Sequence, residues 1–188
     1  MSARRRLHFP RVVYRLGVVA LLALLTQVIA IRAPLGDDDL PRRILLVASY
    51  LLLLIFVAAN VYRPGIAVIG AGLLLNFAAI VANGGLMAIT PQTILKTGSL
   101  PSDAVTGQWL PGSKDILLER GDVHLWFLTD RLTWDAISPA FRAFSIGDVV
   151  IVVGLALTLA ELLLPRFHPE EEASAKAGSP VQEDGELP

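Results

Sequence analysis

The stretch "FSIGDVVIVVGLALTLAELLLP", residues 144–165, carries about a bilayer's worth of apolar side chains and two acids. Asp148 stands at its entrance and Glu161 lies near its end. A mainly apolar run of roughly 17–25 residues is long enough to cross a membrane as a helix. Carboxylates are costly in hydrocarbon, so each acid needs a structural or a functional reason. The stretch therefore predicts a transmembrane helix over 146–164.

The composition of the whole chain supports this reading. Of its 188 residues, 54% are hydrophobic and only 18% are charged, whereas soluble domains are about 25% charged. A net charge of −1 offers no basic surface for nucleic acid, and the absence of cysteine excludes disulfides and thiolate ligands. The three histidines are widely scattered. We expect the lipid bilayer as a partner, and no nucleic acid, metal or cofactor.

Three further apolar runs predict helices over 12–31, 44–61 and 66–82. Backbone polar groups in lipid must be satisfied within the segment, which favours helices. The predicted fold is an all-α membrane protein, in which residues 12–164 form a domain of four transmembrane helices. A basic start before an apolar run also occurs in signal peptides. This run exceeds their usual core of roughly 7–15 residues and lacks a good cleavage site, so we expect a retained helix.

The distribution of arginine predicts an orientation. Residues 1–11 are basic, and cytoplasmic segments are enriched in Lys and Arg. With four crossings, both termini would lie in the cytoplasm. The large loop 86–143 would lie outside. Arg32, Arg42 and Arg43 in the first outer loop oppose this orientation. Residues 165–188 form an acidic tail with little to bury, which predicts disorder.

The polar residues near the membrane surfaces have two readings each. Ser145 and Asp148 have the spacing of a capping box at a helix start, but Asp148 could also belong to a site. Asn76 and Asn83 share a helix face and could hydrogen-bond to another helix as packing contacts. They could instead form a ligand cluster with Gln27. Asn83 is also followed by two glycines, which is typical of a helix end.

Two further features of the chain lie at these surfaces. All three tryptophans, Trp109, Trp126 and Trp134, lie in the large loop, as expected of an aromatic belt at the membrane–water interface. The functional alternative is a lid. We then expect Asn83 to approach Asp148, with Trp126 or Trp134 covering them. For Glu161, at the opposite surface, we expect an ion pair with an arginine of similar depth, Arg63 or Arg166.

Two runs carry a family resemblance. "LNFAAIVANGGLMAITP" (75–91) followed by "FSIGDVVIVVG" (144–154) resembles an uncharacterised bacterial integral-membrane family of unknown function. The likeness covers roughly residues 66–164. It implies a bacterial membrane protein, which with this topology we expect in the inner membrane, and it implies no activity.

A second likeness implies an activity. Asp130-Arg131 and the run ending at Asp148 resemble motifs of lipoprotein signal peptidase, a four-helix intramembrane aspartic peptidase. The resemblance implies that Asp148 takes one catalytic position. Pro139 stands where that family has the other aspartate, so Asp130 or Asp135 would have to supply it. Two carboxylates that share a site can divide the roles of base and acid.

Three functions follow from these observations. The leading one is a non-enzymatic accessory or interaction subunit, which meets a membrane-protein partner through its helix faces. The alternative is an intramembrane aspartic peptidase. A small transporter is the third. It is disfavoured because no acid lies at the bilayer centre and no repeat is visible.

Overall fold

The computed structural model describes residues 14–36, 38–97, 105–134 and 143–163. This part of the chain is mostly helical. Three of its helices are long and apolar enough to cross a membrane: α2 (Leu40–Asn60), α3 (Pro64–Ala82) and α5 (Ile146–Leu163). α1 (Gly17–Arg32) is apolar but shorter. The basic segment 1–11, the acidic tail 165–188 and the candidate Asp135 lie outside the described residues.

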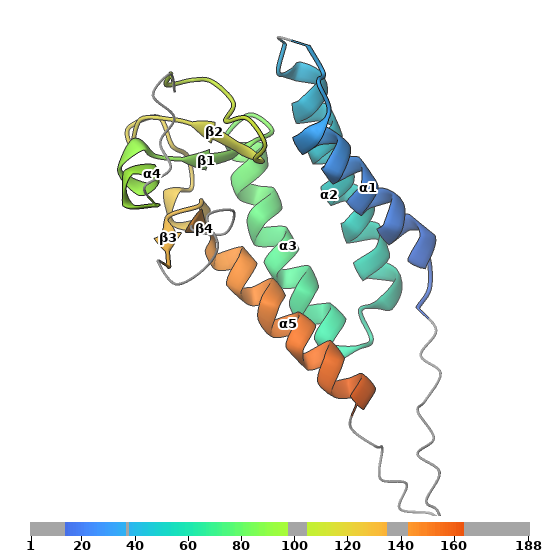
Figure 1. Cartoon of the computed structure of the whole chain (residues 1–188). Coiled ribbons are helices and arrows are strands. Elements are labelled where there is room, and N and C mark those ends of the chain that lie inside the picture. The colour runs from blue at the N-terminus through green and yellow to red at the C-terminus, as the bar shows by residue number, and fades with distance from the viewer. Residues whose placement is uncertain (1–13, 37, 98–104, 135–142, 164–188) are drawn as a thin grey trace, which may run out of the picture.

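The helices form two antiparallel pairs, α1 with α2 and α3 with α5, and α2 packs on α3 between them (Figure 1). The start of α1, the α2–α3 turn and the end of α5 lie at the lower end of Figure 1. The described residues of 83–144, here called the head, lie at the other end, beside the upper part of α3. The head therefore meets the membrane-spanning candidates at one end only.

The first helix starts later than the predicted 12–31. Leu16 has a left-handed backbone conformation, with φ 56°, and the helix begins at Gly17. The backbone N–H of Arg15 donates to the Asn60 side chain at 2.8 Å, and the Asn60 amide donates back to the Arg15 carbonyl at 2.8 Å. The buried Asn60 side chain thus satisfies the backbone N–H and C=O of Arg15, which lies before the first residue of α1. α2 and α3 start before the predicted positions 44 and 66, where the apolar runs begin, because each has a proline in its first turn, a position that proline favours.

Glycines allow α3 and α5 to approach closely. Gly65 and Gly72 on α3 face Gly154 and Gly147 on α5. A Cβ added at Gly72 would lie 2.6 Å from the carbonyl oxygen of Gly147. One added at Gly154 would lie 2.6 Å from the backbone nitrogen of Ile69. Small residues at such contacts let membrane helices pack backbone against backbone.

The head contains strands, so the fold is not all-α and the region 86–143 is more than a loop. β1 (Met87–Ile89) pairs in parallel with β2 (Asp115–Leu117), and α4 (Pro91–Thr97) follows β1. β3 (Leu132–Thr133) pairs antiparallel with β4 (Ala143–Phe144), directly before α5. β1 forms because its apolar side chains are buried on all sides. The short 3₁₀ helix η1 (Trp126–Leu128) packs against α3 and α5.

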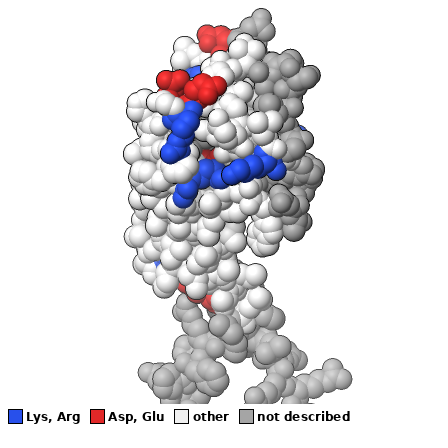
Figure 2. All heavy atoms as spheres, turned by 90° about the vertical axis from the view of Figure 1, so that its left-hand side faces the viewer, with Lys and Arg blue, Asp and Glu red and all other residues white. Residues whose placement is uncertain are grey.

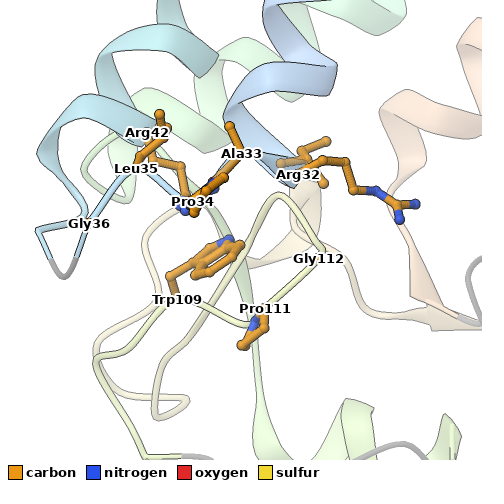
Figure 3. Close-up of a pocket in the computed structure, with 10 residues that line it drawn as sticks. Arg32, Ala33, Pro34, Leu35, Gly36, Arg42, Trp109, Pro111 and Gly112 are labelled. Carbon is orange, nitrogen blue, oxygen red and sulfur yellow. The ribbon is translucent and has the colours of Figure 1, made fainter.

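Two arginines of the first turns of α2 connect the helices to the head. Arg42 is buried, donates to the carbonyls of Ala30 and Ala33 at the end of α1, and lies 3.5 Å from the ring centroid of Trp109. In Figure 3, Trp109 lies against Arg42, and Arg32 points away. Arg43 donates to the carbonyl of Gly84 at 2.7 Å. Arg42 and Arg43 therefore lie in α2 and not in the predicted first loop, and their side chains connect α2 to α1 and to the head.

The glycine contacts make a first prediction. Gly72→Ala and Gly154→Ala should each lower the free energy of unfolding in detergent by about 1–3 kcal/mol, the usual cost of overpacking. Gly17→Ala is the matched control, because a Cβ there meets nothing within 4 Å. Denaturant unfolding of the purified proteins measures the difference. Equal stability of all three variants would show that the contact between α3 and α5 accommodates the added methyl groups and would contradict the prediction.

Candidate functional site

The start of α5 is closed by a reciprocal pair of hydrogen bonds. The backbone N–H of Asp148 donates to Ser145 Oγ at 2.9 Å, and the backbone N–H of Ser145 donates to Asp148 Oδ2 at 3.0 Å. These bonds confirm the predicted capping box. The carboxylate also lies where the positive end of the helix dipole favours a negative charge. Asp148 thus has a structural role before any other is considered.

A buried asparagine connects α3 to this cap. Asn76 is fully buried on α3, and its Nδ2 donates to Asp148 Oδ1 at 2.7 Å. Its Oδ1 accepts a bond from Ser145 Oγ at 2.7 Å. Gly147 makes room for the amide, since a Cβ there would collide with Asn76. The amide that Asp148 receives is therefore that of Asn76 and not that of Asn83.

A lysine of the head completes the cluster. Lys114 lies directly before β2, and its Nζ lies 3.3 Å from Asp130 Oδ2 and 3.4 Å from Asp148 Oδ2. Asp130 is 3% exposed and follows η1. The backbone of Lys114 is held as well, because its carbonyl accepts from the N–H of Met87 at 3.0 Å. One ammonium thus ties the head to the first turn of α5.

The charges of this ion cluster are unequal, because Asp115 adds a third carboxylate near the single lysine. Burial raises the pKa of Asp130 well above its ordinary value, against the opposing effect of Lys114, and burial also raises the pKa of Asp115. Burial by itself would lower the pKa of Lys114, but Asp130 and Asp148 raise it well above its ordinary value. These directions agree with a charged Lys114 held between Asp130 and Asp148.

The predicted site residues are only partly brought together. Asp130 and Asp148 converge on Lys114, so their nearest oxygens are at most about 7 Å apart. Asn83 instead holds the loop at His124, whose N–H donates to its side chain at 2.9 Å, and it donates to the carbonyl of His124 at 2.9 Å. Trp126 lies beside Arg120 and Arg131, Trp134 is 58% exposed, and Gln27 lies half-buried on α1.

Glu161 lies at the other end of α5. Its Oε1 accepts a bond of 2.9 Å from the backbone N–H of Gly65, in the first turn of α3. Arg63 lies 5.0 Å from the ring centroid of Tyr14, and within the described residues it forms no ion pair with Glu161. Arg166 lies outside the described residues. Glu161 therefore caps the neighbouring helix, in place of the predicted pair with Arg63.

Sequence reasoning missed Lys114 and Asp115. Lys114 lies 16 and 34 residues from its two partners, and no periodicity relates positions in different irregular segments. Lysine is rare in this chain beside arginine, which is the one signal that could have drawn attention to it.

A model of a family of unknown function, DUF5317, matches residues 11–160. The chain belongs to this family. The match covers α1, α2, α3 and the head and ends within α5, and it confirms the predicted resemblance to a family of unknown function. No curated protein and no solved structure matches the chain. Family membership therefore adds no activity to what the geometry shows.

The ion cluster predicts a measurable role for Lys114. Lys114→Met should lower the free energy of unfolding in detergent by about 3 kcal/mol, at the low end for a broken buried pair because the side chain keeps 23% exposure. Lys96→Met is the control, since Lys96 is exposed and outside the cluster. Adding Asp130→Asn to Lys114→Met should recover part of the loss. A Lys114 variant as stable as its control would contradict the role.

Proposed function

We propose that the chain is a non-enzymatic integral membrane protein of the bacterial inner membrane, which acts as an accessory or interaction subunit. In this proposal α1, α2, α3 and α5 all cross the bilayer. The head lies outside, and both termini lie in the cytoplasm. The apolar helices favour a bilayer location, and the further statements are argued in turn below.

α1 supports a fourth crossing. Its described 16 residues span about 24 Å at the rise of an α-helix, somewhat less than a hydrocarbon core of roughly 30 Å. It runs antiparallel to α2, and its outward side chains are large and apolar (Leu21, Leu22, Leu24, Leu25, Val28 and Ile29). Tilting or local thinning of the bilayer can accommodate a short helix. Because α1 packs along α2, a bilayer-spanning α2 would place the apolar side chains of α1 in lipid as well.

The contacts of two arginines strengthen the proposed orientation. Arg42 and Arg43 counted against an outer position for the first loop. Both are engaged, Arg42 with the end of α1 and Trp109, and Arg43 with Gly84. Charges that are held in contacts have a structural reason to lie at that end of the helices. The basic N-terminal segment then remains the main determinant of orientation.

The observation that carries a non-enzymatic role is the bonding of Asp148. Its Oδ1 accepts from Asn76, and its Oδ2 accepts from the Ser145 N–H and lies beside Lys114. A general base needs a free lone pair within reach of a substrate proton. Three of the roughly four acceptor sites of this carboxylate are occupied, by α3, by the start of α5 and by the head. These contacts fit a structural role, in which Asp148 fixes the head on the membrane helices.

The surface available for a partner is the outer side of α5. Within the described residues α5 packs mainly on α3, and its exposed side chains are apolar (Val149, Val152, Val153, Leu155, Leu157, Leu159 and Leu163). A lipid-facing helix side of this kind can also receive a helix of another membrane protein.

The topology makes a prediction of its own. A periplasmic-active reporter fused after Lys114 should be active, and the same reporter fused after Ser179 should be inactive. A cytoplasm-active reporter at the same two positions supplies the reciprocal control. The reverse pattern would invert the orientation, and activity at both positions would indicate an odd number of crossings.

One observation favours an intramembrane aspartic peptidase as a second candidate. Asp130 and Asp148, the two described residues that the resemblance implies, meet at one ammonium. A catalytic aspartate pair shares a proton directly, whereas Lys114 contacts both carboxylates here. A rotation of the lysine side chain would be needed before the two acids could act on a common water.

A cleavage assay separates the two candidates. Purified protein in detergent should leave a synthetic lipid-modified signal peptide uncut, and Asp148→Asn should be no different. Lipoprotein signal peptidase provides the positive control for the substrate. Cleavage by the wild type that is lost in both Asp148→Asn and Asp130→Asn, at unchanged melting temperature, would establish the peptidase and defeat the non-enzymatic proposal.

A further inference from the structure

A second group of charges lies on the head, apart from the ion cluster. A hollow of about 420 Å³ is lined by Lys96 of α4, Arg120 and Arg131, together with Thr90, Gln92, Thr93 and Trp126. Figure 2 views the molecule from the side on which α4 and β3 lie in Figure 1. A band of basic side chains crosses that face, and the surface below it is almost free of charge.

The two arginines of this hollow converge on one aromatic ring. The guanidinium carbon of Arg120 lies 3.3 Å from the ring centroid of Trp126, and that of Arg131 lies 4.5 Å from it. Cation–π contact orients both groups but neutralises neither. Trp126 belongs to η1, which packs on α3 and α5.

In the part of the chain that the structure describes, the three cations of the hollow form no ion pair with a carboxylate, although acidic side chains lie above the basic band in Figure 2. Within the described residues, the ion pairs at 4.0 Å or less all involve Lys114, and none involves Lys96, Arg120 or Arg131. The Nε of Arg131 is buried and has no hydrogen-bond partner there. Glu119 flanks Arg120 in sequence, but its carboxylate accepts from Thr106 at 3.3 Å. Three like charges in one hollow repel each other and favour an anion among them.

The position of the hollow in the fold indicates the source of that anion. η1 packs against α5, whose first turn begins at Ile146, so a membrane-spanning α5 places Trp126 near the level of the lipid headgroups. Large exposed apolar side chains also neighbour these residues in sequence: Leu95 before Lys96, and Leu125 and Phe127 on either side of Trp126. A basic band above an almost uncharged surface, as in Figure 2, matches the headgroup and the acyl boundary of a bilayer.

We propose that this hollow binds the phosphate group of an anionic phospholipid, with Arg120, Arg131 and Lys96 as donors and Trp126 as the platform that orients the arginines. The inference rests on the proposed membrane insertion of α5, but it does not depend on which side of the membrane the head occupies. Arginine suits this role because its planar fork of N–H groups matches phosphate oxygens.

Lipid titration tests the proposal on the full chain in neutral detergent. Native mass spectrometry should show phosphatidylglycerol binding about tenfold more tightly than phosphatidylcholine with the same acyl chains. Arg120→Gln with Arg131→Gln should weaken phosphatidylglycerol binding about tenfold or more, since each loses charged hydrogen bonds. Lys96→Gln leaves the Trp126 contacts intact, and it should weaken binding severalfold even if the double variant folds poorly.

Arg32→Gln is the matched control, because it removes one charge at the same end of the helices from an exposed side chain outside the hollow. Its affinity should stay within about twofold of the wild type. Equal binding of both lipids, or an equal loss in the control, would overturn the proposal. If inorganic phosphate binds the wild type as tightly as phosphatidylglycerol does and displaces it completely, the hollow binds a soluble anion, and the lipid proposal is overturned. Failure of the chain to insert would instead contradict the proposed function.

Discussion

The close approach of α3 and α5 is the constraint on which the rest of the structure depends. Because Gly72 and Gly147 carry no side chain, Asn76 can reach across and bond to the first turn of α5. That bond fixes the carboxylate of Asp148, and the fixed carboxylate receives Lys114 from the head. A methyl group at Gly147 would collide with the Asn76 amide, and one at Gly72 would collide with the α5 backbone at Gly147 and Ile151, so either change disturbs the contact that positions Asp148.

The ion cluster contributes more to specificity than to stability. Removing charges from water is costly, and a buried pair often gains no more than well-packed apolar groups would. The ends of apolar helices offer the head little directional information, however, and many placements would bury similar area. Lys114 and Asp130 both belong to the head, so the contact that depends on where the head sits is the one between Lys114 and Asp148 of α5. The cluster thus selects one arrangement of the head.

The sequence predicted the apolar helices, the cap at Asp148 and the family resemblance, because each depends on local pattern: hydrophobic length, an S-x-x-D spacing and two short motifs. It missed the strands of the head, since β1 and β2 have three residues each and pair over a separation that no period reports. Asn76 was correctly considered for an interhelical bond, but its partner could not be named. Lys114 was overlooked because its role exists only once the head folds onto α5.

The two acids that make residues 144–165 unusual now have one physical account. In an antiparallel helix pair, the N-terminus of one helix lies beside the C-terminus of the other, so unpaired N–H groups occur at both ends of the pair. Asp148 satisfies them at the start of α5, and Glu161 satisfies the Gly65 N–H at the start of α3, 96 residues earlier in the chain. Each carboxylate also lies where the helix dipole favours negative charge. Acids at the two ends of one apolar run are therefore what an antiparallel pair requires of the helix that supplies both caps.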